Sequence, residues 1–308
     1  MTTTSTIIDY QNGNAQICLE ADGTRTISYA GELELDWPLN IDIRVSNRCS
    51  NGLNPKTGKA RCVFCHESAT TDGADANYKE LLEILKPLPS GVELAIGSNR
   101  MTYKLFEFIW QCDFRGWIVN LTINQDHVNR DGPQLEELID NAAIHGLGIS
   151  YRSDFKKRHD APFSRLPKLI KYPNTVIHVI EGIDDFESVL KLSELGVRKL
   201  LVLGEKDFGF NLGKRTDSPS HFYWLRNIHR LFECFEIVSF DNLAIERLDI
   251  QRFFHRESWN QFHQGEHSFY INSVDGSFSP HSRSNLKTNW HTVSIQDYFK
   301  RGRHQTFV

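Results

Sequence analysis

Six repeats of a strand pattern followed by a helix pattern constrain this chain more than any other feature of its sequence. Each predicted strand is a short, largely apolar run, and each predicted helix carries apolar residues three and four positions apart. The predicted strands span residues 40–47, 92–97, 117–124, 148–152, 175–181 and 199–204, and the predicted helices span 78–86, 103–112, 134–145, 162–172, 186–195 and 221–234. A lone strand at 236–240 follows. This alternation is typical of parallel βα units in an α/β fold.

The number of units favours part of a barrel over a complete one. A full eight-unit barrel takes about 250 residues. We therefore predict a partial (βα)6 TIM barrel. The alternative is a doubly wound open sheet, but the first βα loop lacks the G-x-G-x-x-G spacing of a dinucleotide-binding turn.

The repeats leave a segment at each end of the chain. Residues 1–38 are predicted to form an N-terminal β-hairpin extension about the turn Ala21-Asp22-Gly23, and residues 39–242 form the barrel core. Residues 243–308 are expected to form a C-terminal cap, with a helix followed by a hairpin about Asp275-Gly276. The basic tail from Tyr298 onward is expected to be loose.

Charge and hydrophobicity exclude several classes of protein. The 308 residues include 35 basic and 39 acidic side chains, so the net charge of -4 provides no direct signal for nucleic acid or an anionic membrane. The N-terminal sequence has no signal-peptide pattern, and no apolar run approaches the roughly 18 residues of a membrane span. We therefore expect a cytoplasmic protein.

Three of the six cysteines cluster directly after the first strand of the repeats. Cys49, Cys62 and Cys65 have the spacing C-x12-C-x2-C, at the carboxyl end of a strand where α/β folds place their chemistry. A structural zinc needs a fourth ligand, and the nearby His66 adjoins Cys65, which makes joint ligation awkward. Three thiolates on a [4Fe-4S] cluster instead leave one iron open to a small molecule. The three clustered cysteines therefore favour a catalytic iron–sulfur centre over a zinc-stabilised α/β binding protein.

At these residues the sequence resembles the radical S-adenosylmethionine (radical SAM) enzymes, which carry C-x3-C-x2-C after the first strand of a (βα)6 partial barrel. The resemblance spans roughly residues 39–240 by the order of strands and helices. It implies that the three cysteines hold a [4Fe-4S] cluster and that S-adenosylmethionine (SAM) binds along the strand ends. The residues that it implies for SAM are Phe64, Gly97, Ser98, Asn99, Ser150, Arg152, Ile180 and Leu203.

The sequence departs from the family pattern in two places. The first cysteine spacing is twelve residues rather than three, and Asn99 stands where the family often has glutamate. Loop insertions add closure entropy slowly, about 0.6 kcal/mol per doubling of length, so a longer spacing can still deliver the third sulfur.

The resemblance also implies a reaction. The cluster would reduce SAM, and the resulting 5'-deoxyadenosyl radical would abstract hydrogen from a substrate, with flavodoxin or ferredoxin as electron donor. Lys206, Arg152 and Asp241 are expected to line the substrate pocket, although Asp241 is also a plausible helix N-cap.

The remaining cysteines bear on the kind of substrate. Cys18, Cys112 and Cys234 lie apart from one another, so a single cluster is expected. A single cluster favours a small-molecule substrate, anionic or nucleotide-like. The alternative within the enzyme class is a peptide-modifying enzyme.

Overall fold

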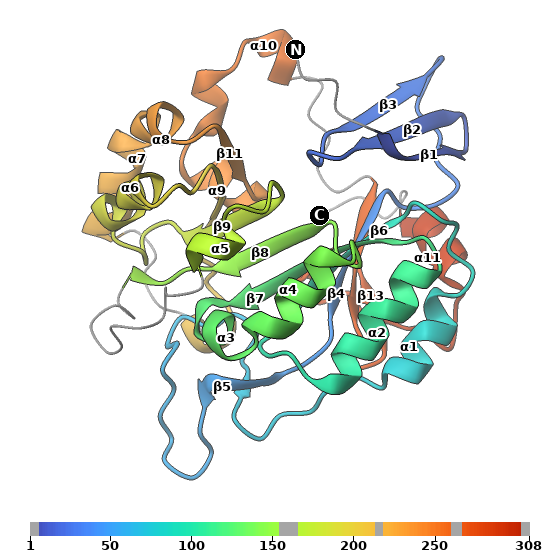
Figure 1. The fold of residues 1–308 in the computed structure, drawn as a ribbon, viewed down its shortest axis with the longest axis horizontal. Helices are drawn as coiled ribbons and strands as arrows, with labels where there is room; N and C mark the ends of the chain where they lie inside the picture. The colour runs from blue at the N-terminus through green and yellow to red at the C-terminus, as the bar shows by residue number, and fades with distance from the viewer. Residues whose placement is uncertain (1–5, 154–165, 213–217, 260–266, 303–308) are drawn as a thin grey trace.

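Two β-sheets organise the chain in the computed structural model, which describes residues 6–153, 166–212, 218–259 and 267–302 (Figure 1). The larger sheet has ten strands in the order β11-β10-β9-β8-β7-β6-β4-β12-β13-β14. Its parallel core comprises β4 (Asn40–Arg44), β6 (Glu93–Gly97), β7 (Ile118–Asn124), β8 (Gly146–Ser150), β9 (Thr175–Ile180), β10 (Lys199–Leu203) and β11 (Ile237–Phe240). All the strands predicted in the repeats are therefore present.

The strand order distinguishes between the two folds predicted from the sequence. From β4 to β11, strands that are adjacent in the sheet follow one another in the chain, and every pair is parallel. A doubly wound fold requires a reversal of this order, so that alternative is wrong. The described strands form an open sheet rather than a closed barrel, because β11 and β14 occupy its two ends.

The helices lie mainly between consecutive strands of the sheet. They are α1 (Tyr78–Leu85), α2 (Tyr103–Phe114), α3 (Gln125–Arg130), α4 (Gly132–Asp140), α5 (Leu166–Leu169), α6 (Phe186–Glu194), α7 (Pro219–Asn227) and α8 (His229–Cys234). Side chains of Asn77, Thr102, Asp185 and Ser218 accept backbone N–H groups at four helix starts, as capping residues do. The helix predicted at 221–234 is divided in two, and part of the one predicted at 162–172 lies outside the described residues. No described helix is long and apolar enough to span a bilayer.

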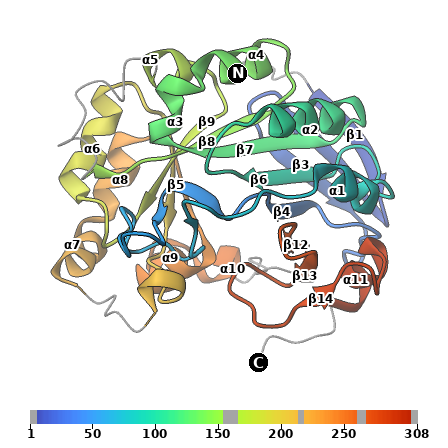
Figure 2. The same ribbon diagram turned by 90° about the horizontal axis from the view of Figure 1, so that it is seen from below.

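The strands alternate between an apolar face and a polar face. On β4, Ile41 and Ile43 are buried, whereas Asp42 between them is exposed, and β6 and β7 show a similar alternation. Parallel sheets covered on both faces are apolar on both. The apolar face therefore packs under helices such as α1, α2 and α4, seen outside the strands in Figure 2, and the inner face is left polar.

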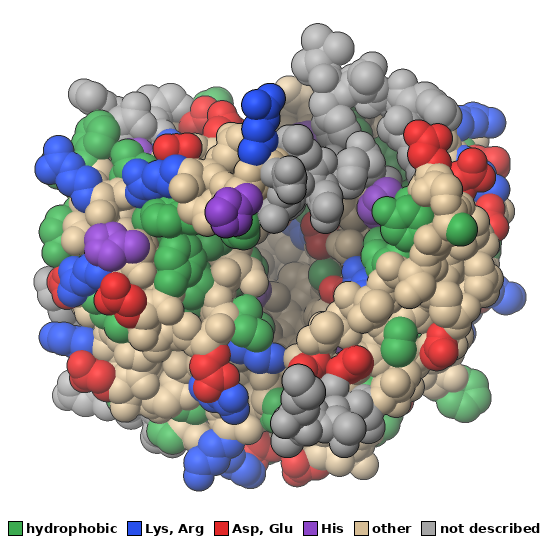
Figure 3. Space-filling view, turned by 90° about the horizontal axis from the view of Figure 1, so that it is seen from above, with side chains coloured by type: hydrophobic (Ala, Val, Ile, Leu, Met, Phe, Trp, Pro, Cys, Tyr) green, Lys and Arg blue, Asp and Glu red, His purple; other side chains and the backbone are tan. Residues whose placement is uncertain are grey.

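The large sheet is strongly curved. Four strands separate β10 from β4 in the sheet, yet the segment after β10 touches the cysteine-containing segment after β4. The N–H of Phe210 donates to the Cys65 carbonyl oxygen at 3.0 Å. The curvature brings the carboxyl ends of distant strands together, and the space-filling view shows the molecule hollowed at its centre, with acidic, basic and histidine side chains on the walls (Figure 3).

The N-terminal segment forms a separate three-stranded antiparallel sheet. The predicted hairpin is present as β2 (Ala15–Glu20) and β3 (Arg25–Tyr29), and β1 (Thr6–Asn12) adds a strand that the sequence analysis missed. This sheet is bonded to the amino ends of the large sheet, where Arg25 forms an ion pair with Glu93 and Lys199 Nζ donates to the Asp22 carbonyl oxygen at 2.8 Å.

The C-terminal segment extends the large sheet rather than only covering it. The predicted hairpin about Asp275-Gly276 is present as β12 (Ser268–Asn272) and β13 (Ser277–Ser279), but β12 also pairs in parallel with β4, which was not predicted. β14 (Thr288–Asn289) pairs with β13. The predicted helix is observed as α9 (Asn242–Arg247) and the 3₁₀ helix η3 (Ile250–Phe253), and the short α10 (Arg256–Trp259) follows.

The expectation of a loose tail from Tyr298 is wrong for its described part. Helix α11 (Ile295–Gly302) buries Tyr298 and Phe299, and the Tyr298 ring packs on Phe269 and Phe278 with centroid distances of 5.3 and 5.1 Å. The aromatic residues therefore pack this segment on the core as a helix, although it also carries basic residues. Residues 303–308 lie outside the described part of the chain.

We predict that Tyr298→Ala lowers the free energy of unfolding by about 3 kcal/mol, the usual cost of removing a buried aromatic ring. Urea unfolding followed by circular dichroism measures this change. Tyr103→Ala is the matched control, because Tyr103 is 75% exposed and its loss is expected to cost less than about 0.5 kcal/mol. Equal effects of the two substitutions would show that α11 contributes nothing to the core.

Candidate functional site

Cys49 lies in β5 (Arg48–Leu53), a strand that follows β4 but belongs to neither sheet. The sequence analysis predicted no strand between residues 47 and 92, so β5 was missed. Isolated bridges join both Arg48 and Leu53 to Thr70, so this strand is held against the far end of the same loop. Cys49 is buried, whereas Cys62 and Cys65 are partly exposed.

The residues that lengthen the first cysteine spacing fold back on themselves. Asn54 and Lys59 form an antiparallel bridge, in which Asn54 N–H donates to the Lys59 carbonyl oxygen at 2.9 Å. At the base of this hairpin, the Asn51 carbonyl oxygen accepts the N–H of Cys62 at 3.1 Å. Cys62 is thereby bonded to a residue only two positions from Cys49. The spacing is long in the sequence and short in space.

The base of the hairpin is anchored to helix α3. Arg61 Nη1 lies 2.7 Å from Asp126 Oδ2, and Asn51 Nδ2 donates to the same oxygen at 3.0 Å. Arg61 Nη1 also donates to Asn51 Oδ1 at 3.1 Å. These contacts fix the segment that carries Cys62 relative to the carboxyl end of β7, where α3 begins.

The three thiols lie close enough for their charges to interact. Burial is the main cause that raises the pKa of Cys62 to about 12, the Arg152 guanidinium opposes the rise, and Cys49 and Cys65 add to it. Burial also raises the pKa of Cys49, with the Cys65 thiol contributing in the same direction. In the absence of a cation, Cys49 and Cys62 remain protonated at neutral pH.

The donor set fits an iron–sulfur centre in its chemistry. Within the described ranges, no group of three or more Cys, His, Asp or Glu side chains is arranged to hold a metal ion, so the thiols are neighbours rather than a closed ligand set. They nonetheless supply three sulfur atoms from one segment, and Cys65 N–H donates to the Cys62 carbonyl oxygen at 3.2 Å in the turn between two of them. The positive charges of Arg152 and Arg61 act on Cys62 and favour its thiolate.

Two of the predicted cofactor-binding residues, Phe64 and Arg152, are brought together. The guanidinium carbon of Arg152 lies 5.1 Å from the centroid of the Phe64 ring. Arg152 is 8% exposed, and its Nη1 lies 3.4 Å from Asp184 Oδ2, which also accepts the N–H of Ile180 at 2.7 Å. A charge-compensated guanidinium is thus held over an aromatic ring beside the thiols.

The other predicted cofactor-binding residues lie along the carboxyl edge of the sheet. They are Gly97, Ser98 and Asn99 at the end of β6, Ser150 at the end of β8, Ile180 at the end of β9 and Leu203 at the end of β10. Some of their polar groups are already engaged: the Ser98 hydroxyl donates to the Arg100 carbonyl oxygen at 2.7 Å, and the Leu203 carbonyl oxygen accepts the N–H of Glu181 at 2.9 Å. Contact between these residues and SAM stays a prediction.

Lys206 lies beside the cysteine segment. Its Nζ is 3.5 Å from His66 Nε2, and the Phe208 ring packs edge-on against His66 at a centroid distance of 5.5 Å. In the described part of the chain Lys206 has no carboxylate partner within ion-pair distance, unlike Arg152. Lys206 and Arg152 therefore both lie beside the cysteine segment, Arg152 with a carboxylate partner and Lys206 without one among the described residues. Their role in lining a substrate pocket stays a prediction.

Asp241 has an architectural role in the structure. Its Oδ1 accepts the N–H of Ala244 at 2.8 Å, as the N-cap of α9, and the N–H of Gly204 at 2.9 Å. These bonds tie α9 to the end of β10. The helix-cap alternative is therefore observed, and the predicted pocket role of Asp241 has no contact to support it.

Buried charges hold the segment after β10 in place. Glu181 is 0% exposed, and it pairs with His221 Nδ1 at 2.9 Å and with Arg247. The N–H of Glu205 donates to Glu181 Oε1 at 3.2 Å, and Asn211 Nδ2 donates to Glu205 Oε1 at 3.0 Å. Glu181 is therefore a buried structural carboxylate, although it lies at the carboxyl end of a strand.

Two polar residues of the inner face were not predicted as site residues. Asp42 is exposed on the central strand β4. His178 on β9 is partly exposed, and burial together with the Arg152 charge lowers its pKa to about 4, so its imidazole is neutral at pH 7. Both could have been found from the same signal, a single polar residue between two apolar ones in a strand. Because successive side chains of a strand point to opposite faces, such a residue lies on the face opposite the helices.

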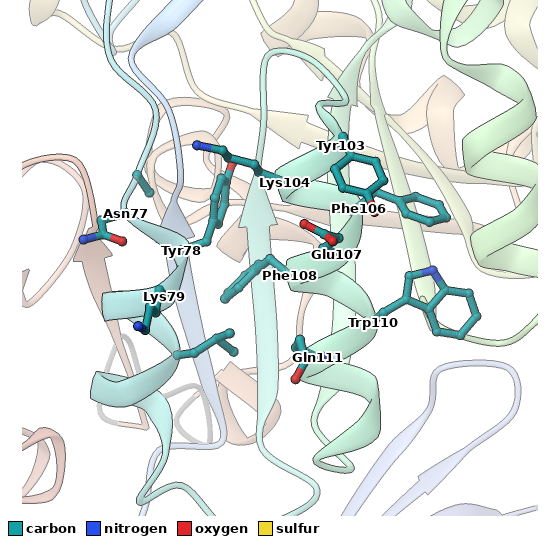
Figure 4. A pocket seen from close by; sticks show the side chains of 12 residues that line it. Asn77, Tyr78, Lys79, Tyr103, Lys104, Phe106, Glu107, Phe108, Trp110 and Gln111 are labelled. Atoms are coloured by element: carbon teal, nitrogen blue, oxygen red, sulfur yellow. The ribbon is translucent and has the colours of Figure 1, made fainter.

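A separate groove of about 680 Å3 lies between α1 and α2 (Figure 4). Its aromatic side chains come from α1 and α2 and include Tyr78, Tyr103, Phe106 and Trp110. Its lining contains no residue of the cysteine segment or of a strand's carboxyl end. The groove is therefore distinct from the candidate active site.

Two solved structures have a fold similar to that of this chain. The crystal structure of Streptococcus suis SuiB bound to precursor peptide SuiA matches 86% of the chain with a TM-score of 0.57, and that of SuiB bound to S-adenosylmethionine matches 88% with a TM-score of 0.58. Sequence identity is 14% in both cases, so the likeness is one of fold. The chain covers 65% and 68% of those longer chains. No protein-family model and no curated protein matches the sequence.

The comparison confirms the predicted fold class at a coarse level. The chain has a mixed α/β fold with a large, mostly parallel sheet, similar to that of a protein whose structure contains bound S-adenosylmethionine.

We predict that the hairpin 54–59 is dispensable for the site. Replacing these six residues by an Asn-Gly turn should leave iron incorporation during anaerobic reconstitution unchanged, because the Asn51–Cys62 bond lies outside the deleted part. Asp126→Ala, which removes the anchor of Arg61, should instead reduce the iron content. Loss of iron from the shortened protein with the fold intact would contradict this prediction.

We also predict that Gly209 is required for the contact between the two segments. A Cβ at Gly209 would lie 2.4 Å from the His66 carbonyl oxygen and 2.7 Å from that of Cys65. Gly58 has the same φ of +64° but nothing within 4 Å, so Gly58→Ala is a matched control for backbone strain, about 1–2 kcal/mol in each variant. Gly209→Ala should reduce the iron content and Gly58→Ala should not. Equal iron content in the two variants would show that the contact between the two segments is not needed for cluster binding.

Proposed function

We propose that this protein is a radical SAM enzyme that holds a [4Fe-4S] cluster on Cys49, Cys62 and Cys65. The observation that carries the proposal is the cysteine segment itself. Three thiols from one segment, Cys49 buried and the other two partly exposed, lie at the carboxyl edge of a parallel sheet, beside an Arg152–Phe64 pair. The likeness in fold to a structure with bound S-adenosylmethionine supports it.

The proposed cluster would supply the electron that cleaves SAM, delivered by a flavodoxin or ferredoxin. The chain itself would supply the cysteine ligands of the cluster, orient SAM and exclude water from the site. The hydrogen bond at Asn51 keeps Cys62 near Cys49, and the segment after β10 binds the Cys65 carbonyl oxygen through the Phe210 N–H. These contacts hold the ligand segment from both sides.

SAM is proposed to lie along the carboxyl edge of β6 to β10. Phe64 offers an aromatic surface for the adenine, and Arg152 offers a cation for the carboxylate. The segment Gly97-Ser98-Asn99 would face the methionine amino group. Asn99 is neutral where the family often has glutamate, so it would bind the ammonium group by its amide oxygen alone.

The curvature of the sheet supports the finer proposal of a partial (βα)6 barrel. Neighbouring strands follow the chain order, and the segments after β4 and β10 touch across the inner face. In such an architecture the substrate enters from the open side and meets SAM at the carboxyl edge.

A peptide is the substrate class that the comparisons favour. SuiB, whose fold this chain shares, was crystallised with a precursor peptide, whereas our main expectation was a small anionic or nucleotide-like molecule. The peptide alternative is therefore the better supported of the two. A zinc-stabilised binding protein remains the alternative outside the enzyme class, and the following prediction separates it.

Anaerobic reconstitution with iron and sulfide, followed by SAM and dithionite, should yield 5'-deoxyadenosine from the wild-type protein. Replacing any one of the three cysteines by alanine should abolish this product, because each supplies one ligand. Cys234→Ala is the control, since Cys234 is exposed and distant from the cluster in sequence. A colourless protein that binds zinc and cleaves no SAM would overturn the proposed function.

A further inference from the structure

Asp42 occupies an unusual position for a carboxylate. It lies on a central strand, paired with Ala95 of β6 on one side and with Tyr270 of β12 on the other, and yet it is exposed. A residue at this position cannot reach solvent from a sheet edge. Its alternation with the buried Ile41 and Ile43 places its side chain on the inner face of the sheet, opposite the helices. The molecule is hollowed at its centre (Figure 3).

Asp42 has no counter-ion in the part of the chain that the structure describes. The neighbouring Glu93 pairs with Arg25 and accepts a hydrogen bond from Asn120 at 2.7 Å, so its charge is compensated. The Asp42 side chain makes no ion pair or hydrogen bond with any residue that the structure describes. Although Asp42 keeps accessible surface, the protein around it displaces most of the bulk water, and this desolvation, with the Glu93 charge adding to it, raises the pKa of Asp42 to about 6. The carboxylate form still predominates at pH 7.

Lys206 provides the opposite charge in the same hollow. Its Nζ lies 3.5 Å from His66 Nε2, which lies 3.0 Å from Glu67 Oε1, and Glu67 pairs with Arg44, which shares a face of β4 with Asp42. The Lys206 charge accordingly lowers the pKa of Asp42, although the two side chains form no ion pair in the described residues. Other charges nearby are already paired: Arg44 Nε lies 2.7 Å from Glu67 Oε2. Among the described side chains named here, Asp42 and Lys206 are thus left without an ion-pair partner, on segments that are far apart in the order of the sheet.

An uncompensated charge that is largely surrounded by protein is costly. Two such charges of opposite sign that face one hollow without pairing are best compensated by a ligand that carries a cation and an anion of its own.

We propose that Asp42 and Lys206 anchor the substrate, with Asp42 binding an ammonium or guanidinium group and Lys206 binding a carboxylate. The substrate is accordingly a zwitterion of the amino-acid or peptide class. This inference rests on the proposed function, because the hollow is taken to be the substrate side of the SAM site. The proposal replaces the anionic substrate expected from the sequence by a substrate that carries both a positive and a negative charge.

The test measures binding of three dipeptide probes to the reconstituted protein by equilibrium dialysis. Glycylglycine carries both charges, N-acetylglycylglycine only the carboxylate, and glycylglycinamide only the ammonium. Wild-type protein should prefer glycylglycine to either blocked form by about tenfold, the effect of one charge-assisted hydrogen bond. An end-blocked peptide with one lysine and one glutamate distinguishes side chains from chain termini as the source of the charges.

The variants assign each charge to one residue. Asp42→Asn should abolish the preference for glycylglycine over the N-acetylated form and retain the preference over the amide, and Lys206→Met should do the reverse. Asp140→Asn, which removes the same charge from the exposed end of α4, is the matched control and should retain both preferences.

The outcomes separate this inference from the proposed function. Equal affinity for all probes, no binding of any probe, or unchanged preferences in Asp42→Asn would overturn the anchoring pair. SAM cleavage is measured on the same wild-type preparation. Its absence would overturn the proposed function whatever the dipeptides do, whereas cleavage without a charge preference would overturn only the anchoring pair.

Discussion

The curvature of the large sheet is the constraint on which the site depends. A flat sheet would keep β4 and β10 four strands apart. In the observed fold the Phe210 N–H reaches the Cys65 carbonyl oxygen and Lys206 reaches His66. The buried pairs of Glu181 with His221 and Arg247 hold the strand ends from which this contact extends. Thiols, cations and inner-face residues are therefore neighbours only because the sheet bends.

Curvature also explains the composition of the strands. The outer face of each strand packs under helices and is apolar, as Ile41 and Ile43 show. The inner face is not covered by helices, so polar side chains such as Asp42 and His178 can lie there. The glycine at position 148 fits the same account, since a Cβ there would lie 2.6 Å from Thr122 Oγ1 and 2.7 Å from the His178 ring. Polar side chains converge over it from both neighbouring strands.

The sequence predicted those features that depend on local periodicity and missed those that depend on distant contacts. The strands from β4 to β11 follow from apolar runs, and the Asp241 cap follows from its place before a helix. The parallel pairing of β12 with β4 joins segments more than two hundred residues apart, and no local pattern encodes it. The cysteines were recognised by type and spacing, whereas the ion pairs of Arg152 and Glu181 required the folded chain.

The hairpin at 54–59 has a consequence for how the cysteine segment can change over time. Asn54 and Lys59 form a bridge across the hairpin, and the hydrogen bond between Asn51 and Cys62 lies at its base. The tip of the hairpin can therefore gain or lose residues without moving a sulfur atom. The distance along the chain between the first two cysteines is thus free to drift while their separation in space is conserved. A search that requires a fixed interval between these cysteines would pass over such a chain, and its geometry would be recognised only after folding.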